Sequence, residues 1–468
     1  MKKKASKIVF YIIPFAILIF MLMLFYPGVA TYDGYSQWNQ VQSKIISDAH
    51  PFFSTYFMYM LSKIYNSMTT VIIFQILLFS IIWGYFCNTI KATRKKDFYI
   101  KIIFTVFLCF SPLIGIYNIT LWKDILYTDY LFLAGLILYS WAKNKFNFPI
   151  YKYVLLGLIF ILVFSYRHNG VIVSVLLMIM FYIICLIKYK SKFINKKEFL
   201  KSFSTLITFL LLFSLILIPK TLYINKYNEQ EKKKNEISYS TLDGYVLWMM
   251  GAHLKNNNIN NKDDLKFLNN IIPIAEWKRI YDPCLINNIG SSENLDKKYL
   301  VDNTKKLRYT FIKYSKKNPG TILKHYLIAD GLLINPISHL YGYVYVYSFP
   351  ELIHLSGYEI KSIFPKLENI YMRVINVSIT KPFIMFYQPA LILYITILLA
   401  LLLIKKLHEK KYWFILLPMI MNTASLLPIN LAQDLRYVYI NYLTFFAILL
   451  IFILNFHSIF KFKKYNNK

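Results

Sequence analysis

The feature that most constrains this chain is a series of apolar stretches long enough to cross a lipid bilayer. A transmembrane helix needs about 20 consecutive apolar residues, within a range of roughly 17 to 25. Nine apolar stretches have this length, and a tenth at residues 153–165 is shorter. They span residues 8–26, 71–90, 102–120, 125–141, 153–165, 171–187, 202–219, 383–404, 413–430 and 438–457. The sequence therefore predicts an all-α polytopic membrane protein of about ten transmembrane helices.

The basic residues are distributed as in the cytoplasmic loops of membrane proteins. Lys and Arg number 54 against 23 Asp and Glu, which gives a net charge of +31. In a soluble protein this excess suggests a nucleic-acid partner, but no nucleic-acid-binding motif is present and 57% of the residues are hydrophobic. The basic runs lie in alternate connections between apolar stretches, where Lys and Arg are retained in the cytoplasm. We therefore expect a multi-pass protein of the plasma membrane, with both termini in the cytoplasm and no nucleic-acid partner.

The same alternation divides the chain into three regions. An N-terminal transmembrane region covers residues 1–219 and contains a long first outer loop at 27–70. A more polar extracytoplasmic segment covers 220–382, and a C-terminal transmembrane region covers 383–468. A cleaved signal peptide is the alternative for the first stretch, because Gly28-Val29-Ala30 resembles a cleavage site. The apolar run is longer than such signals have, so we expect the helix to be retained.

The segment 220–382 is expected to be mainly helical. The pattern predicts a helix at 303–317, a short amphipathic helix at 321–334 and a brief strand at 342–347. Some of its aromatic residues are candidates for stacking against an acceptor glycan, although packing inside the segment is the favoured role. These residues are Trp248, Trp277 and the tyrosine-rich run 341–347.

The sequence gives no support for a nucleotide cofactor and leaves metal dependence open. There is no Gly-rich phosphate loop and no P-loop. The four Cys and eight His form no closely spaced cluster of the kind that binds zinc. His50 and His168 do lie close to polar clusters in the predicted outer connections. A divalent metal at those clusters is therefore an alternative that the residues do not exclude.

Four polar clusters lie in connections predicted to face the outside. The first follows the first apolar stretch, and the others occupy the third-to-fourth, fifth-to-sixth and ninth-to-tenth connections. We expect the chemistry of the protein to lie in these clusters. Their candidate residues are Asp33, Gln37, Gln40 and His50 in the first, Lys123 and Asp124 in the second, Arg167, His168 and Asn169 in the third, and Arg436 in the fourth.

Each cluster also has a purely structural explanation. Asp33 is in place to cap the surface helix predicted after it, and His50-Pro51 is favoured as a turn. Trp122-Lys123 is typical of a membrane boundary, where the Lys side chain snorkels to the interface. Asn169-Gly170 suits a tight turn, and Arg436 is able to contact headgroups.

Three cations favour a functional explanation over these structural ones. Lys123, Arg167 and Arg436 lie in short outer connections, where the insertion bias disfavours basic residues. Together with Asp33 they indicate an anionic ligand at the outer membrane surface. Arg suits phosphate because its fork donates two parallel hydrogen bonds. A lipid phosphate or diphosphate is therefore the expected ligand.

With these motifs in this order, the chain resembles the GT-C superfamily of membrane glycosyltransferases, and within it a poorly characterised bacterial polytopic family. The resemblance runs from the first apolar stretch to the last. Its motifs are short, and their order and common side of the membrane give it its specificity. They are Tyr26-Pro27-Gly28 before Asp33-Gly34, His50-Pro51 with Thr55, Trp122-Lys123-Asp124, Arg167-His168-Asn169-Gly170 and Asp434-Leu435-Arg436-Tyr437.

The resemblance implies a GT-C-like fold and a polyprenyl-phosphate sugar donor used on the outer face. In such enzymes an acid of the first loop is the general base for the acceptor hydroxyl, which makes Asp33 the expected catalytic residue. Better-known members often carry two adjacent acids at this place. This chain has Asp33-Gly34 instead, so the resemblance does not decide metal dependence.

The expected activity is therefore that of an inverting glycosyltransferase acting on a glycan or glycolipid acceptor of the cell envelope. A lipid-linked polysaccharide polymerase or ligase is the first alternative, because it would also have many spans, a large outer loop and outer Arg and His residues. A lipid or solute transporter agrees less well with the sequence. Transporters place polar residues near the bilayer midplane, whereas the charges here lie at the outer rim.

Overall fold

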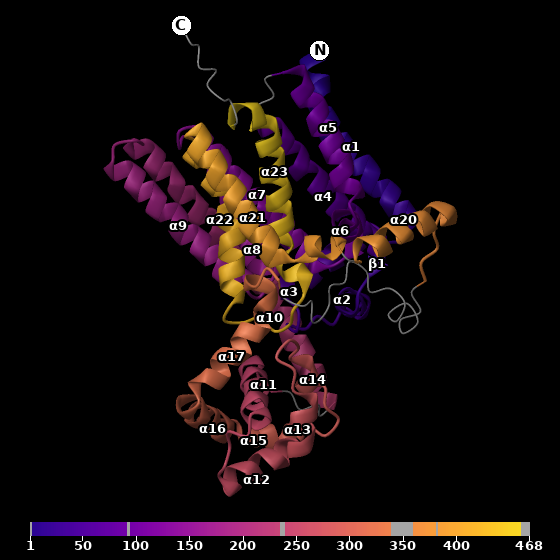
Figure 1. Ribbon diagram of the computed structural model, residues 1–468, viewed down its shortest axis with the longest axis vertical. Helices are drawn as coiled ribbons and strands as arrows, with labels where there is room; N and C mark the ends of the chain where they lie inside the picture. The colour runs from indigo at the N-terminus through magenta and orange to yellow at the C-terminus, as the bar shows by residue number, and fades with distance from the viewer. Residues whose placement is uncertain (1, 91–93, 235–238, 338–358, 381, 460–468) are drawn as a thin grey trace. The chain divides into compact units, whose positions relative to one another are not determined.

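The computed structural model describes residues 2–90, 94–234, 239–337, 359–380 and 382–459. It shows a helical protein (Figure 1). Within these residues, β structure is limited to two paired strands of two residues each and one isolated bridge. The strand predicted at 342–347 and the tyrosine-rich run 341–347 lie outside the described residues. The chain forms two compact units.

The first unit carries the apolar stretches. It is built from the described residues of Met1–Tyr227, Tyr345–Ser425 and Arg436–Lys468. Every stretch predicted to span the membrane coincides with a helix or, in one case, with a bent pair of helices. The helices are α1 (Lys2–Leu24), α4 (Met68–Thr89), the pair α5 (Lys95–Phe110) and α6 (Pro112–Asn118), α7 (Lys123–Lys143), α8 (Ile150–Tyr166), α9 (Gly170–Lys190), α10 (Lys196–Lys234), α21 (Pro389–Leu407), α22 (Trp413–Leu426) and α23 (Tyr439–Ile459).

Among the described residues, seven helices are long and apolar enough to cross a membrane. They are α1, α4, α7, α9, α10, α21 and α23, and the pair α5–α6 adds an eighth if it is counted as one span. α8 and α22 are apolar but shorter, at 17 and 14 residues. The all-α, multi-pass membrane class is therefore confirmed, and the count of ten spans stays a prediction.

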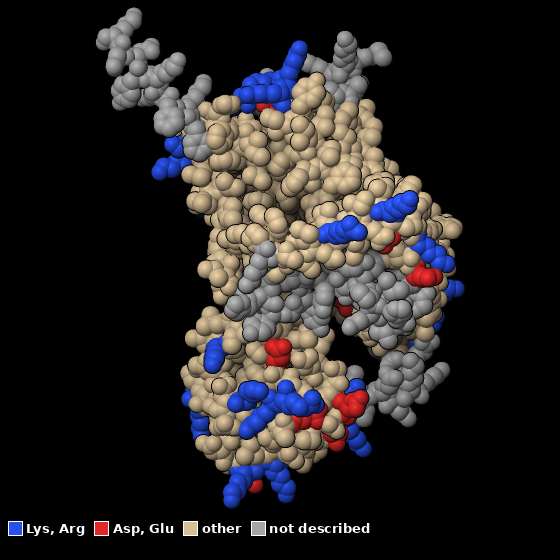
Figure 2. All heavy atoms as spheres, turned by 45° about the vertical axis from the view of Figure 1, so that its right-hand side comes forward, with Lys and Arg blue, Asp and Glu red and all other residues tan. Residues whose placement is uncertain are grey.

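The surface of the first unit agrees with this class. Figure 2 shows a broad band with almost no charged side chains on the drawn face, bounded by Lys and Arg side chains at one end. Large apolar side chains are exposed along α9 and α10, for example Ile179, Leu211 and Leu215. An exposed apolar surface of this kind is stable in contact with lipid rather than with water.

The stretch predicted as a continuous span at 102–120 is bent. α5 and α6 meet at an angle of 69°. Ser111 is in an extended conformation, and Pro112 is the first residue of α6. Proline has no N–H for the helical hydrogen bond, and it disfavours the helical conformation of the residue before it. A span predicted from hydrophobicity alone does not reveal such a bend.

The loop at 27–70 contains two helices and one of the two strands. The surface helix predicted after Asp33 is α2 (Tyr32–Ser43), and α3 (Phe52–Ser62) follows it. Strand β1 (Val29–Ala30) pairs in parallel with β2 (Thr120–Leu121), which lies between α6 and α7. This short ladder joins the first loop to the start of α7.

The second unit is formed by the described residues of Asn228–Val344 together with Leu426–Leu435. Its core contains Trp248 and Trp277, which are 1% and 0% exposed. Both tryptophans therefore have the packing role and are not free to stack against a glycan. Its helices are α11 (Thr241–Lys255), α12 (Lys262–Ile271), α13 (Ile274–Ile280), α14 (Asn287–Gly290), α15 (Lys297–Asp302), α16 (Thr304–Lys317), α17 (Pro319–Ala329) and α18 (Gly331–Ile334).

The predicted helix at 303–317 is present as α16, and the one at 321–334 is divided into α17 and α18. The bounds of the second unit nevertheless differ from the predicted segment 220–382. α20 (Pro365–Ser378) groups with the first unit, where the Tyr371 hydroxyl donates to the Phe110 carbonyl at 3.2 Å. α20 buries only one narrow side, as a helix lying at an interface does.

Residues 426–435 belong to the second unit although they follow α22. Ala432 forms an antiparallel bridge with Leu285, and Gln433 N donates to the Cys284 carbonyl at 3.1 Å. The side chains of Asn430 and Gln433 donate to carbonyls at the end of α17, at 2.8 and 2.6 Å. The connection before α23 is therefore held in place along its length.

Candidate functional site

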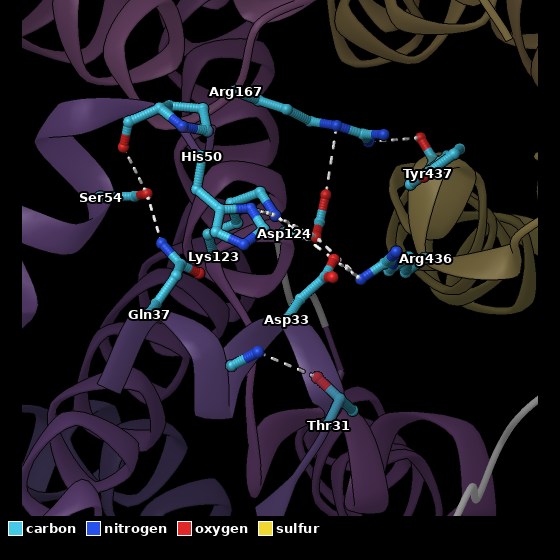
Figure 3. Close-up of polar contacts among 12 residues, drawn as sticks. Thr31, Asp33, Gln37, His50, Ser54, Lys123, Asp124, Arg167, Arg436 and Tyr437 are labelled. Atoms are coloured by element: carbon cyan, nitrogen blue, oxygen red, sulfur yellow. Dashed lines mark hydrogen bonds and ion pairs between the residues drawn. The ribbon is translucent and has the colours of Figure 1, made fainter. Parts of the chain in front are cut away.

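The two paired strands place two carboxylates in equivalent positions. Ala30 and Leu121 are partners in the ladder. Asp33 and Asp124 each lie three residues further along, in the first turns of α2 and α7. Because the strands are parallel, both chains leave the ladder in the same direction. Residues that are 91 positions apart in the sequence are thereby brought to one site (Figure 3).

Asp33 does not cap α2. The N-cap is Thr31, whose hydroxyl accepts a hydrogen bond from Gly34 N at 3.3 Å. The structural explanation considered for Asp33 is therefore wrong, and its carboxylate is free to take part in the charged cluster.

Gly34 explains why a second acid does not follow Asp33. A Cβ atom at this position would lie 2.1 Å from the carbonyl oxygen of Leu121. Any side chain would therefore collide with the backbone of β2, and only glycine permits the close approach of α2 to that strand. The difference from the two-acid pattern has a steric cause in this chain.

Three cations surround the two carboxylates. Arg436 Nη1 donates to Asp33 Oδ2 at 2.6 Å, and Lys123 Nζ lies 3.6 Å from the same oxygen. Arg167 Nε lies 3.2 Å from Asp124 Oδ1, while Lys123 and Arg436 are both 3.9 Å from Asp124 Oδ2. The three cations predicted to act together do converge (Figure 3). Three positive and two negative groups leave one positive charge in excess.

The two carboxylates differ in access. The side chain of Asp33 is 26% exposed, whereas that of Asp124 is 1% exposed. Burial by itself raises the pKa of Asp33, but the charges of Lys123 and Arg436 outweigh it and hold that pKa well below its usual range. Asp33 is therefore an ionised carboxylate that a ligand is able to reach. Asp124 is buried, and its carboxylate orients the cations.

His50 completes the cluster as a neutral group. Its Nδ1 lies 3.3 Å from Lys123 Nζ, so the neutral imidazole accepts a hydrogen bond there. Burial and the charge of Lys123 lower the pKa of His50 to about 4. The turn explanation of His50-Pro51 is thus incomplete, because the side chain also contacts the charged site.

Aromatic rings and helix ends complete the surroundings of the cations. The Arg167 guanidinium lies 4.1 Å from the centre of the Tyr437 ring, and that of Arg436 lies 5.2 Å from the Trp122 ring. Both arginines precede a helix by three residues, since α9 begins at Gly170 and α23 at Tyr439. The N-terminal ends of α2, α7, α9 and α23 all lie at or next to the site, and such ends favour negative charge.

The two glutamines predicted as ligand-binding residues hold the loop together. Gln37 is fully buried and its Nε2 donates to the hydroxyls of Ser54 and Thr55, at 2.9 and 2.8 Å. Gln40 Oε1 accepts from Ser47 N at 3.0 Å. Gln37 thus fixes α2 against α3, which explains the presence of Thr55 among the motifs, and Gln40 fixes the turn after α2.

Asn169 and His168 are neighbours in the sequence, but their side chains have different surroundings. Asn169 Nδ2 donates to Asn422 Oδ1 and Ser425 Oγ, at 3.3 and 3.1 Å. Asn422 in turn donates to the Tyr437 carbonyl at 2.9 Å, and Arg167 Nη1 donates to the same carbonyl at 3.3 Å. Asn169 therefore supports the position of Arg167, whereas His168 is exposed and faces a separate cavity.

Sequence reasoning missed Asn422 and Tyr127, whose hydroxyl donates to Asn422 Oδ1 at 2.8 Å. Both lie inside apolar stretches. The amide of Asn422, in the interior of the stretch 413–430, was the available signal, because an amide buried among apolar residues needs partners.

The ligand set favours an anion over a metal ion. Both carboxylates of the site are engaged by ammonium or guanidinium groups. In the part of the chain that the structure describes, no group of three His, Cys, Asp or Glu side chains is arranged to hold a metal ion.

Comparison with known proteins gives no match: no family model, no curated protein and no solved structure matches this chain.

Proposed function

We propose that the protein is a glycosyltransferase of GT-C type that uses a polyprenyl-phosphate sugar donor. The observation that carries the proposal is an accessible carboxylate, Asp33, held within 4 Å of two cations, Lys123 and Arg436, in a site with an excess of positive charge. A transferase of this kind needs a base for the acceptor beside a binding site for the leaving phosphate. Asp33 would supply the base and the neighbouring cations the phosphate site, within one cluster.

The excess charge of the site suits a sugar phosphodiester. Such a group carries one negative charge, which would neutralise the one unmatched positive charge among Lys123, Arg167 and Arg436. Arginine binds phosphate oxygens through parallel hydrogen bonds, and the neighbouring helix ends add a favourable field. The side chains of Lys123 and Arg436 are about 10% and 14% exposed, and a bound phosphate would contact this exposed part.

Donor binding would also activate the base. In the ligand-free site Asp33 is paired with Lys123 and Arg436, and its low pKa makes it a weak proton acceptor. A phosphate that engages these two cations would draw them from Asp33 and lower the positive field around it. The pKa of Asp33 would then rise toward its usual range, where it accepts a proton more readily.

The reaction follows from this arrangement. The acceptor hydroxyl attacks the anomeric carbon of the sugar while Asp33 takes its proton. The bond between the anomeric carbon and the phosphate oxygen breaks, and the polyprenyl phosphate leaves with the electron pair. Lys123, Arg167 and Arg436 stabilise the charge that develops on it. A single displacement of this kind inverts the anomeric centre.

The proposed location is the outer face of the plasma membrane, with both termini in the cytoplasm. The support for it is the alternation of basic connections in the sequence, which retains Lys and Arg inside. Nucleotide sugars are not available on the outer face, so a lipid-linked donor is required there. The acceptor would be a glycan or glycolipid of the cell envelope.

The test is transfer of labelled sugar from a polyprenyl-phosphate donor in membranes that contain the wild-type protein or Asp33→Asn. Loss of general-base catalysis should lower the rate by about a hundredfold to ten-thousandfold. Asp302→Asn, at an exposed acid of α15, is the matched control and should retain the wild-type rate. Equal activity in Asp33→Asn would remove Asp33 from the mechanism. Transfer of a preassembled glycan instead of one sugar would favour the polymerase or ligase alternative.

A further inference from the structure

A second feature of the first unit lies beside Arg167 and is not used by the proposed chemistry. It is a cavity of about 110 Å³. One water molecule takes up about 30 Å³ in the liquid, so the cavity has room for a short piece of chain. Its apolar walls are Phe52, Phe53, Phe164, Val171, Phe213, Ile216 and Leu217, with Pro51 and Ser165 between them.

The remaining residues that line the cavity are charged or titratable. Arg167, His168, Lys220 and Asp48 lie on its border. Lys220 Nζ lies 2.9 Å from Asp48 Oδ2, and both side chains are about 40% exposed. The cavity therefore combines an aromatic and aliphatic interior with a border of polar and mostly basic groups. An amphiphile with an anionic end has the same two parts, one apolar and one charged.

Arg167 joins this cavity to the charged site. Its guanidinium pairs with Asp124, and the residue is also among those that line the cavity. A phosphate held by Arg167 would therefore have its ester substituent next to the phenylalanine walls. A sugar in that place would leave its hydroxyl groups without partners, which is unfavourable in an apolar cavity. A hydrocarbon chain meets no such cost.

The wall formed by α10 is firmly attached at one end only. Near its start, Thr205 Oγ1 donates to the Tyr153 carbonyl at 3.1 Å, and the Tyr182 hydroxyl donates to the Ser202 carbonyl at 3.0 Å. Beyond the cavity, the helix is held by the exposed Lys220–Asp48 pair and by ring contacts of Tyr223. Exposed ion pairs contribute only about 0–1 kcal/mol, so movement of this end of α10 chiefly has to break the contacts of the Tyr223 ring with Phe52, Tyr56 and Tyr59, each worth about 0.5–1.5 kcal/mol.

We propose that this cavity binds the start of the hydrocarbon chain of a lipid phosphate whose phosphate is held at Arg167, and that the chain enters between α3 and α10. The proposal rests on the proposed function for the position of the phosphate. The rest of the chain would run along the lipid-facing side of α10, where Leu211 and Leu215 are more than half exposed. Separation of the Lys220–Asp48 pair would open the path.

The test is binding of a polyprenyl phosphate to the purified full-length protein in lipid nanodiscs, with two variants on neighbouring positions of α10. Ile216→Trp places an indole in the cavity, whereas Leu215→Trp points it toward lipid, because Leu215 is 61% exposed and does not line the cavity. We expect the apparent Kd to rise at least tenfold in Ile216→Trp and to stay within twofold in Leu215→Trp. Thermal unfolding of both variants verifies that they are folded.

Two further readouts separate the possible failures. Competition by a phosphate ester with a one-carbon chain should be equal in the wild type and Ile216→Trp, since this probe does not reach the cavity. A diazirine placed on the first isoprene unit should label peptides that contain Phe52, Phe53 or Phe213. Tight binding that is the same in Ile216→Trp, or labelling elsewhere, would overturn the cavity assignment and leave the proposed function intact. No binding by the wild type would overturn both.

Discussion

α7 and α10 are both long apolar helices of the first unit, but they differ in how far protein surrounds them. Over an apolar stretch of 18 residues, 89% of the α7 residues are buried, whereas only 17% of the α10 residues are. α7 packs against α4, α8 and α23. α10 instead exposes most of its length, as a helix does where lipid is its solvent.

This difference corresponds to the two tasks proposed for the helices. α7 begins with Lys123 and Asp124, which must be held to within a fraction of an ångström to act on a phosphate. Enclosure on all sides supplies that precision. α10 forms the wall of a cavity that a chain must enter from the membrane, so loose attachment is an advantage there. Packing density thus separates the part that positions charges from the part that admits a ligand.

The largest effect expected from this comparison comes from replacing one acid beside each helix. These acids are Asp124 of α7 and Asp48, which pairs with Lys220 of α10. Asp124→Asn leaves Arg167 with no buried counter-charge, and breaking such a pair costs about 3–5 kcal/mol. Asp48→Asn breaks the exposed pair with Lys220, which costs about 0–1 kcal/mol. Unfolding of both variants in the same detergent measures the difference. Equal losses of stability would contradict the contrast between enclosed and exposed charges.

A second prediction tests packing without charge. Leu131 of α7 is 0% exposed, and Leu211 of α10 is 62% exposed. Leu131→Ala should cost about 2–5 kcal/mol because it leaves a cavity, while Leu211→Ala should change the stability by less than about 0.5 kcal/mol. Thermal unfolding followed by tryptophan fluorescence provides the measurement. A destabilised Leu211→Ala would mean that α10 is packed in the membrane by something other than lipid.

A third prediction compares two glycines in tight contacts. A Cβ on Gly34 would lie 2.1 Å from the Leu121 carbonyl, and one on Gly157 would lie 2.4 Å from the Thr205 carbonyl of α10. Both substitutions to Ala force a shift, and overpacking of this kind costs about 1–3 kcal/mol. We expect Gly34→Ala to lose sugar transfer, because the shift displaces Asp33. Gly157→Ala should retain most of it, since its contact with Thr205 does not involve the residues of the charged cluster. The reverse ranking would show that the contact between α8 and α10, and not the one between α2 and β2, sets the position of the carboxylate.

The last prediction concerns pH. In the loop after α2, His50 contacts Lys123 of α7, and Asp48 pairs with Lys220 of α10. Because the pKa of His50 falls to about 4 in the folded protein from 6.5, the fold favours the neutral imidazole. The stability that this preference contributes is present above about pH 6.5 and is lost as pH falls toward 4.

Unfolding of wild type and His50→Asn between pH 7.5 and 4.5 measures this contribution. The wild type should lose stability more steeply below pH 6.5, because the variant has no imidazole to protonate. The charges around His50 that oppose or favour its protonation are Lys123, Arg436, Asp33 and Asp124. Parallel profiles would show that the pKa of His50 is not lowered in the folded protein.

The sequence alone was sufficient to predict the apolar helices and most of the charged site. Apolar runs are local signals, so each predicted stretch coincides with a helix or with the bent pair. Lys123, Arg167 and Arg436 were identified because cations are unusual in short connections that are predicted to face the outside. Their convergence with Asp33 in the structure gives this argument its support.

Other features depend on contacts between distant residues, and for them the sequence has no local signal. The ladder between Val29–Ala30 and Thr120–Leu121 is only two residues long on each side. The steric need for Gly34 and the support of Arg167 by Asn422 both follow from tertiary approach. The assignment of 426–435 to the second unit likewise depends on pairing with Leu285, 147 positions earlier than Ala432.

The short parallel ladder has a consequence for how this site is able to vary. Asp33 and Asp124 each follow a partnered residue by three positions. Adding or removing one residue in either connection would turn the carboxylate by about 100° around its helix. Side chains nearby can therefore be exchanged more freely than the length of these connections can change. Distant relatives of this chain would then be recognised by the intervals between acids, strands and helix starts rather than by matching residues.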